Sequence, residues 1–164
     1  MPHAIRIRTN GGPEVLAWED VTVGDPGPGE ARVRHTAVGV NYIDTYHRSG
    51  LYKLALPSAI GSEAAGVVEA VGSGVDWVKA GDRVAYCGGS LGSYSEVRVM
   101  PAERLVKLPD AISDRVAATL MLKGLTVQYL FRQTHRLQAG ETILFHAAAG
   151  VSASSRASGR GHSA

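Results

Sequence analysis

Residues 4–9 read AIRIRT and are followed at once by the turn residues NGGP (10–13). This alternation of a short segment rich in β-branched residues with Gly and Pro continues to about residue 108. The further segments are VLAWEDV (15–21), ARVRHTAVGV (31–40), AAGVVEAV (64–71), DRVAYC (82–87) and YSEVRVM (94–100). Strands this short, bounded by Gly and Pro, predict an all-β, barrel-like unit.

The first of these segments shows the two-residue period of a strand. Ile5 and Ile7 face one way, while Arg6 and Arg8 face the other. We therefore expect a half-buried strand near the edge of its sheet. Between the predicted strands, NYIDTYHRSGLY (41–52) mixes aromatic and polar residues and fits a short helix or a loop better than a strand.

Length and composition bound the class of protein. The chain has 164 residues, of which 45% are apolar and 20% charged, enough to form one domain plus a piece of another. A net charge of +2 without runs of like charge points to neither a nucleic-acid nor a membrane partner. The single cysteine, Cys87, excludes an internal disulfide framework and fits a reducing, cytoplasmic location, and no signal peptide or membrane span is expected.

The pattern changes after residue 112. Ser113 is a good N-cap residue before an apolar-rich run, so residues 114–134 are predicted to form one helix, or two helices broken at Gly124. The later segment TILFHAAAG (142–150) reads as a continuous apolar strand that ends in small residues. This order is typical of the first strand of a doubly wound α/β domain, where the chain approaches a dinucleotide pyrophosphate.

The last segment, VSASSRASGRGHSA (151–164), has one aliphatic residue, five serines and no periodicity. It cannot form the helix that must follow a phosphate-binding strand. We therefore divide the chain into a mainly β domain at 1–112, helices with only the first strand of an α/β domain at 113–150, and a tail at 151–164.

Seven motifs stand out along the first 150 residues. They are NGGPEVL (10–16), GVNYIDTY (39–46), RSGLY (48–52), GSEAAG (61–66), AGDRV (80–84), KGLTV (123–127) and FHAAAG (145–150). Together they resemble the zinc-free quinone oxidoreductases of the medium-chain dehydrogenase/reductase superfamily. The resemblance implies a GroES-like barrel followed by a Rossmann domain, truncated here. It also implies an NADPH-dependent reductase of quinones or conjugated carbonyls (enones), the full-length parent being a homodimer.

The residues agree with the zinc-free branch. Zinc needs three or four thiolate, imidazole or carboxylate ligands that converge on one point. In the zinc alcohol dehydrogenases, which this chain also resembles, a Cys stands at the position of Asn41 and a His at that of Ser62. No metal site is therefore expected, and a substrate oxygen must be polarised by hydrogen-bond donors or by the geometry of the cofactor.

The resemblance assigns roles within residues 41–52. Asn41, Tyr42, Asp44 and Tyr46 are implied to contact the nicotinamide side of NADPH, while Asn41, Tyr46 and Tyr52 are implied to be catalytic residues that hold the quinone. Judged from the residues alone, the same side chains could form a polar helix cap with packing aromatics, and Tyr52 could merely close a loop.

A second group of implied cofactor contacts lies further along the chain. Lys123, Thr126 and Tyr129 follow one another at a helical spacing of three, and the resemblance places this helix beside the cofactor. A lysine in an apolar helix is costly unless its ammonium group meets an anion or water. Gly150, at the end of the predicted strand, is expected to face the pyrophosphate.

The tail suggests a separate hypothesis. In the resembled family the chain continues after Gly150 with a glycine turn and an apolar helix, and residues 152–164 are compatible with that pattern in a shifted reading frame. We hypothesise that residues 151–164 are the out-of-frame product of a single-base deletion, the alternative being a genuine disordered tail or an expression scar. Two functions follow: an NADPH:quinone reductase whose truncated chain is inactive alone, or a catalytically silent GroES-like module or partner-binding fragment.

Overall fold

The computed structural model describes residues 1–144 of the chain. Gly150, most of the predicted strand at 142–150 and the tail at 151–164 lie outside the described residues. The chain divides into two compact units, Met1–Thr119 and Leu120–Ala164, and each is described by itself. The first unit is built mainly of β-strands and the second begins within a helix, which confirms the predicted fold class.

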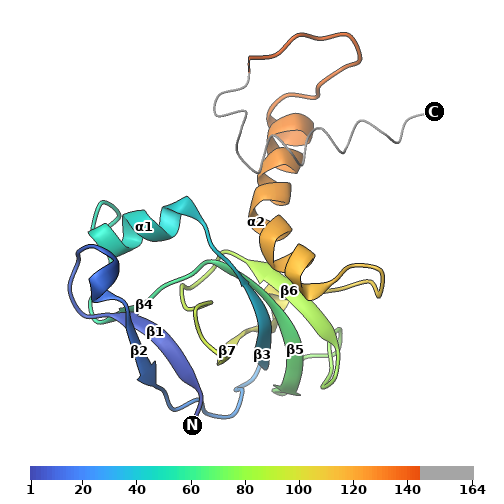
Figure 1. Cartoon of the computed structure of the whole chain (residues 1–164). Helices are drawn as coiled ribbons and strands as arrows, with labels where there is room; N and C mark the ends of the chain where they lie inside the picture. The colour runs from blue at the N-terminus through green and yellow to red at the C-terminus, as the bar shows by residue number, and fades with distance from the viewer. Residues whose placement is uncertain (145–164) are drawn as a thin grey trace. The chain divides into compact units, whose positions relative to one another are not determined.

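The first unit consists of two antiparallel sheets (Figure 1). The smaller sheet has the order β2 (Ala17–Asp20), β1 (His3–Ile7), β4 (Ser58–Ala59). The larger has the order β7 (Val97–Pro101), β3 (Glu30–Gly39), β5 (Glu63–Val71), β6 (Arg83–Cys87), β8 (Val106–Lys107). Short 3-10 turns at Pro13–Val15 and Ala102–Arg104 complete the unit.

The first strand departs from its expected place. β1 is the central strand of the three-stranded sheet, so the expectation of an edge position was wrong. Its N-terminal half also joins the loop before β7, because Ile5 N donates to Tyr94 O at 2.7 Å. β1 thus has β2, β4 and the loop before β7 as neighbours. Its buried residues are accordingly Ala4 and Ile7, which do not alternate with a period of two.

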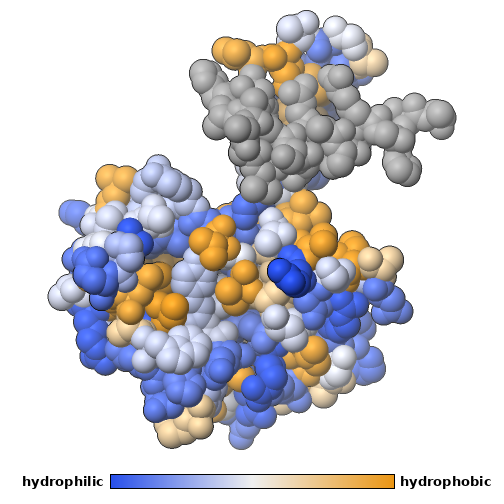
Figure 2. Space-filling view, viewed as in Figure 1, coloured by the Kyte–Doolittle hydropathy of each residue, from blue (hydrophilic) through white to orange (hydrophobic). Residues whose placement is uncertain are grey.

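The core of this unit lies on the inner face of the larger sheet. Its members are small and β-branched side chains around the fully buried Tyr86, among them Val33, Val68 and Val84. Small residues let the strands approach, since a Cβ on Gly66 of β5 would collide with the carbonyl of Arg34 on β3. On the face seen in Figure 2, apolar side chains reach the surface only as separate patches.

The segment 41–52, which the sequence left as helix or loop, contains helix α1 (Tyr42–Ser49). Gly50 ends the helix in the left-handed conformation, with φ +83°, where a side chain would be strained. Helix α2 (Asp114–Tyr129) runs through Gly124 without a break and continues as a π-helical turn at Leu130–Thr134. One helix is therefore the correct alternative.

The start of α2 is fixed to the barrel within the first unit. Ser113 Oγ accepts the N–H of Val116 at 3.3 Å, as expected of an N-cap residue. The Asp114 carboxylate accepts hydrogen bonds from Thr36 Oγ1 at 2.6 Å and from Arg83 NH2 at 2.6 Å. These contacts and the Arg83 charge lower the pKa of Asp114.

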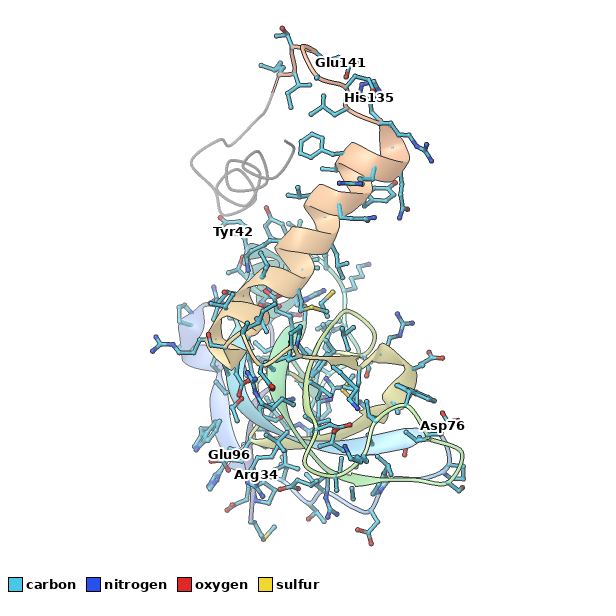
Figure 3. All side chains as sticks on the ribbon, turned by 90° about the vertical axis from the view of Figure 1, so that its right-hand side faces the viewer. Arg34, Tyr42, Asp76, Glu96, His135 and Glu141 are labelled. Carbon is cyan, nitrogen blue, oxygen red and sulfur yellow. The ribbon has the colours of Figure 1, made fainter. Side chains whose placement is uncertain are left out.

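The second unit contains the rest of α2 and the chain that follows it. His135 and Glu141 lie together there, with His135 Nε2 at 2.9 Å from Glu141 Oε2 (Figure 3). Residues 142–144, where the predicted strand begins, are not in a strand. A strand requires hydrogen-bonded neighbours, and the described residues supply none at this point. None of the helices in the described residues is long and apolar enough to cross a bilayer.

Candidate functional site

The site is built around the first turn of α1. Asn41 has extended backbone angles (φ −125°, ψ 149°), and the helix begins at the next residue. Asp44, at the third helical position, accepts the main-chain N–H of Asn41 at 2.9 Å. A carboxylate at this position satisfies an N–H group that the helix leaves unpaired and interacts favourably with the helix dipole. The sequence N-x-x-D therefore determines where the helix starts.

Asp44 is also the centre of a buried set of hydrogen bonds. Its side chain is 4% exposed, and it accepts hydrogen bonds from Ser62 Oγ at 3.1 Å and from Tyr94 OH at 2.7 Å. Burial, followed by the hydrogen bond and the charge of Asp44, raises the pKa of Tyr94 well above its usual range. Tyr94 consequently keeps its proton and remains a donor at neutral pH.

Glu63 extends this set on the other side of Asn41. It is fully buried in β5, and its Oε1 accepts Asn41 Nδ2 at 2.8 Å. Gly39, its partner in β3, has no side chain because a Cβ there would collide with Glu63 and with the carbonyl of Ala118. We call Asn41, Asp44, Ser62, Glu63 and Tyr94 the polar network. It joins α1, β5 and the loop before β7.

Three tyrosines lie close together on α1 and just after its C-terminal end. The ring centroids of Tyr42 and Tyr46 are 5.3 Å apart in an edge-to-face arrangement, and those of Tyr46 and Tyr52 are 5.4 Å apart. Tyr42, labelled in Figure 3, is 76% exposed, and Tyr52 is 48% exposed, so both rings are open to solvent. We call these three residues the tyrosine cluster. Exposed aromatic faces of this kind can stack on a planar ring.

The structure brings together all five residues that the sequence proposed between positions 41 and 52. It separates them by environment, since Asn41 and Asp44 are buried and hydrogen-bonded, whereas Tyr42 and Tyr52 are exposed and Tyr46 is half-buried. The helix cap expected of the polar side chains is present, whereas the contacts with nicotinamide and quinone implied for these five residues stay predictions. The polar side chains cap the helix, and the aromatic side chains remain available to a ligand.

The two positions that hold metal ligands in zinc alcohol dehydrogenases are occupied differently here. Asn41 and Ser62 donate to the carboxylates of Glu63 and Asp44. Among residues 1–144, no three His, Cys, Asp or Glu side chains lie close enough together to hold a metal ion. Burial and the nearby Glu63 raise the pKa of the Cys87 thiol, which disfavours its metal-binding thiolate form.

Lys123, Thr126 and Tyr129 all lie on the part of α2 that belongs to the second unit. Lys123 is half-buried, whereas Thr126 and Tyr129 are exposed. Thr126 Oγ1 donates back to the carbonyl of Leu122 at 2.7 Å, so its hydroxyl hydrogen already has an acceptor. Gly150 lies outside the described residues. The cofactor contacts proposed for these four residues stay predictions.

Three members of the polar network, Ser62, Glu63 and Tyr94, were not selected as site residues from the sequence. Glu63 could have been found, because a carboxylate within the small and apolar run AIGSEAAGVV (59–68) is costly to bury unless it has a partner. Tyr94 carries no such local signal. Its contact with Asp44 spans fifty positions of sequence and depends on the assembled barrel.

The arrangement can perform two tasks. The polar network fixes the start of α1 and leaves the second N–H of the Asn41 amide as a donor. The tyrosine cluster offers exposed aromatic rings, inclined to one another, that carry phenolic hydroxyl groups. Such a site can hold a planar, weakly polar molecule and give hydrogen bonds to its oxygen atoms.

The chain is similar to several known proteins. Residues 27–110 match the alcohol dehydrogenase GroES-like domain family. A quinone oxidoreductase from Pseudomonas aeruginosa is 60% identical over 92% of this chain, and a 2-haloacrylate reductase from a Burkholderia species is 49% identical over 92%. A crystal structure of Escherichia coli quinone oxidoreductase complexed with NADPH matches 90% of the chain with 51% identity and a TM-score of 0.88. The chain spans about half of each relative: 46%, 47% and 46% of their respective lengths.

Proposed function

We propose that this chain, which belongs to the quinone oxidoreductase family of the medium-chain dehydrogenase/reductase superfamily, supplies the substrate-facing barrel of an NADPH-dependent reductase. The substrates we propose are quinones or related conjugated carbonyls. The observation that carries the proposal is the exposed tyrosine cluster beside a buried polar network at the start of α1.

The residues present fit the nicotinamide end of NADPH. The solvent-open rings of Tyr42 and Tyr52 offer faces for a planar heterocycle, and the Asn41 amide offers a donor. Glu63 and Asp44 are buried and already accept hydrogen bonds from within the barrel. The parts proposed to hold the phosphates, Gly150 above all, lie outside the described residues.

In the proposed reaction, NADPH, when bound, would supply a hydride, and this hydride with one proton would convert the two carbonyl oxygens of a quinone into the two hydroxyl groups of a hydroquinone. The tyrosine cluster holds the quinone ring flat and excludes water from one of its faces. Asn41, oriented by Glu63, donates a hydrogen bond to an oxygen on which negative charge develops. Tyr46 or Tyr52 donates a proton through its phenol, or solvent does so.

Several finer assignments belong to the same proposal. Asn41, Tyr46 and Tyr52 hold the substrate, and Tyr42, Asp44, Lys123, Thr126, Tyr129 and Gly150 form or support the cofactor side. We keep a homodimeric full-length parent and a cytoplasmic location as further parts of the proposal. The Burkholderia relative is named for a 2-haloacrylate, which supports including activated alkenes among the candidate substrates.

The alternative is a catalytically silent GroES-like module. It is favoured by the self-contained bonding of the polar network, in which each side chain has a partner in the barrel. Titration of NADPH with the purified 164-residue chain, followed by nucleotide fluorescence, separates the two descriptions of this chain. Saturable micromolar binding contradicts the silent module, and no change in fluorescence supports it.

The reductase proposal itself is tested with a chimera. Residues 1–137 of this chain are joined to the part of the Pseudomonas aeruginosa relative that follows the matching position. We expect the chimera to oxidise NADPH with 1,4-benzoquinone as acceptor. A folded chimera that binds NADPH but reduces neither quinones nor conjugated carbonyls contradicts the proposal, because the barrel then fails to supply the substrate site.

A further inference from the structure

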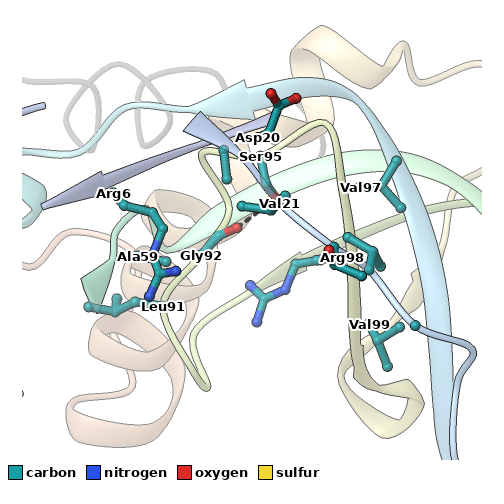
Figure 4. A pocket seen from close by; sticks show the side chains of 14 residues that line it. Arg6, Asp20, Val21, Ala59, Leu91, Gly92, Ser95, Val97, Arg98 and Val99 are labelled. Carbon is teal, nitrogen blue, oxygen red and sulfur yellow. Dashed lines mark hydrogen bonds between the residues drawn. The ribbon is translucent and has the colours of Figure 1, made fainter. Parts of the chain in front are cut away.

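A pocket lies in the first unit, and none of the candidate-site residues lines it. It has a volume of about 480 Å³ and is lined by fourteen residues (Figure 4). The lining comes from β1, from the segment at the end of β2, from the loop before β7 and from β7 itself. It contains none of the members of the polar network or of the tyrosine cluster.

Two arginines reach this pocket from different sheets. Arg6 comes from β1 and Arg98 from β7, and both side chains line the cavity (Figure 4). Among the described residues, Arg6 makes no side-chain hydrogen bond and no ion pair. Arg98 donates only to neutral acceptors, namely Ser90 Oγ at 2.8 Å, Ser90 O at 3.3 Å and Tyr86 OH at 3.4 Å.

Other arginines of the first unit pair with carboxylates. Arg8 pairs with Glu19 at 2.9 Å, and Arg32 and Arg34 pair with Glu69 at 3.2 and 2.6 Å. The arginines that line the pocket are therefore distinguished from these neighbours by lacking a carboxylate among the described residues. The contacts to Ser90 and Tyr86 hold the Arg98 guanidinium in place, so its position is fixed without its charge being neutralised.

The negative charge nearby is too small to balance both arginines. Asp20 is the acidic residue of the lining, and its carboxylate is 3.3 Å from His3 Nε2. The rest of the lining includes the apolar residues Val21, Val23 and Leu91, whereas Val97 and Val99 point to the side of β7 opposite to Arg98 (Figure 4). The pocket thus combines two guanidinium groups with an apolar wall.

We propose that this pocket binds the dianionic phosphate group of a small phosphorylated molecule. A guanidinium offers parallel N–H donors to phosphate oxygens, and two such groups match the charge of a phosphate dianion better than that of a single carboxylate. A volume of about 480 Å³ exceeds what phosphate alone fills, and it lies in the range of small-ligand sites. The apolar wall would receive the organic part of the ligand.

The test uses calorimetric titration of the 164-residue chain with phenyl phosphate and, separately, with inorganic phosphate, at constant ionic strength and pH 7.5. We expect saturable millimolar binding of phenyl phosphate. Tighter binding of phenyl phosphate than of phosphate supports an organic phosphate as the ligand, and equal binding supports free phosphate in the same arginine pair. Absence of saturable binding by both probes overturns the proposal.

Variants locate the binding. Arg6→Gln removes a side chain without described polar contacts, so the fold should be unaffected, and we expect at least fivefold weaker binding. Arg98→Gln should weaken binding at least as much. Arg8→Gln is the matched control, because it removes the same charge from an arginine that is exposed and already paired. Equal weakening by Arg8→Gln and Arg6→Gln contradicts the site, since a general loss of charge would then explain both.

Discussion

Replacement of Asp44 tests whether the polar network holds the start of α1. Asp44→Ala leaves three donors without their acceptor: Asn41 N, Ser62 Oγ and Tyr94 OH. A hydrogen bond to a charged group contributes about 1.5–3 kcal/mol, so three of them give roughly 4–9 kcal/mol if each is lost in full. Removing a buried carboxylate recovers several kcal/mol of desolvation, and half-buried Tyr94 regains water. We expect a net loss of about 2–4 kcal/mol.

Asp44→Asn provides the matched comparison. Its amide oxygen can accept from Asn41 N and Tyr94 OH, which share one carboxylate oxygen in the native chain. Its NH₂ group then faces Ser62 Oγ, and that hydroxyl can turn to accept. The expected loss is about 1 kcal/mol.

Urea unfolding at pH 7, monitored by circular dichroism, gives the free energy of unfolding of each variant. The comparison requires that the variants unfold with equal m-values. If Asp44→Ala costs less than 1 kcal/mol, or as little as Asp44→Asn, the network does not hold the helix start and the reasoning is refuted.

Three further predictions concern the barrel. Burial lowers the pKa of His35 from 6.5 to about 4, so folding stability should be full above about pH 6.5 and fall as the pH drops toward 4, by at most about 3 kcal/mol. In His35→Gln, the free energy of unfolding measured from pH 4 to 8 should fall less steeply below pH 6.5. An unchanged slope would mean that other groups cause the loss. Gly39→Ala should cost about 1–3 kcal/mol in urea unfolding, whereas Gly24→Ala, with open space around it, should change stability little; equal effects contradict the close packing at Gly39. Ser62→Ala removes one donor from Asp44 and should cost about 1 kcal/mol, and a stabilised variant would show that this bond is unfavourable.

Local pattern was enough to find most of the strands, but not their neighbours. The period of two in AIRIRT predicted β1, yet its central place depends on β4, whose two residues carry no strand pattern. Likewise, Ser113 and the apolar run after it predicted a helix. A glycine inside a helix costs only about 1 kcal/mol relative to alanine. Local propensity therefore did not decide whether Gly124 ends the helix, and the structure shows that it does not.

The site shows the same division between local and long-range information. Asn41 and Asp44 are three residues apart, so their contact follows from helix geometry and was accessible to sequence reasoning. Glu63 and Tyr94 reach the same point from elsewhere in the chain, across twenty-two and fifty positions. The approach of these segments depends on strand pairing, which no short motif encodes.

The most direct test of the account measures quinone reduction by the chimera with single changes in the tyrosine cluster. Tyr52→Ala should raise the KM for 1,4-benzoquinone at least tenfold, because it removes an exposed ring face. Ser49→Ala, at the exposed far end of α1, should leave KM and kcat unchanged. If Tyr52→Ala and Ser49→Ala both behave like the unmodified chimera, the tyrosine cluster does not hold the substrate and the central claim is wrong.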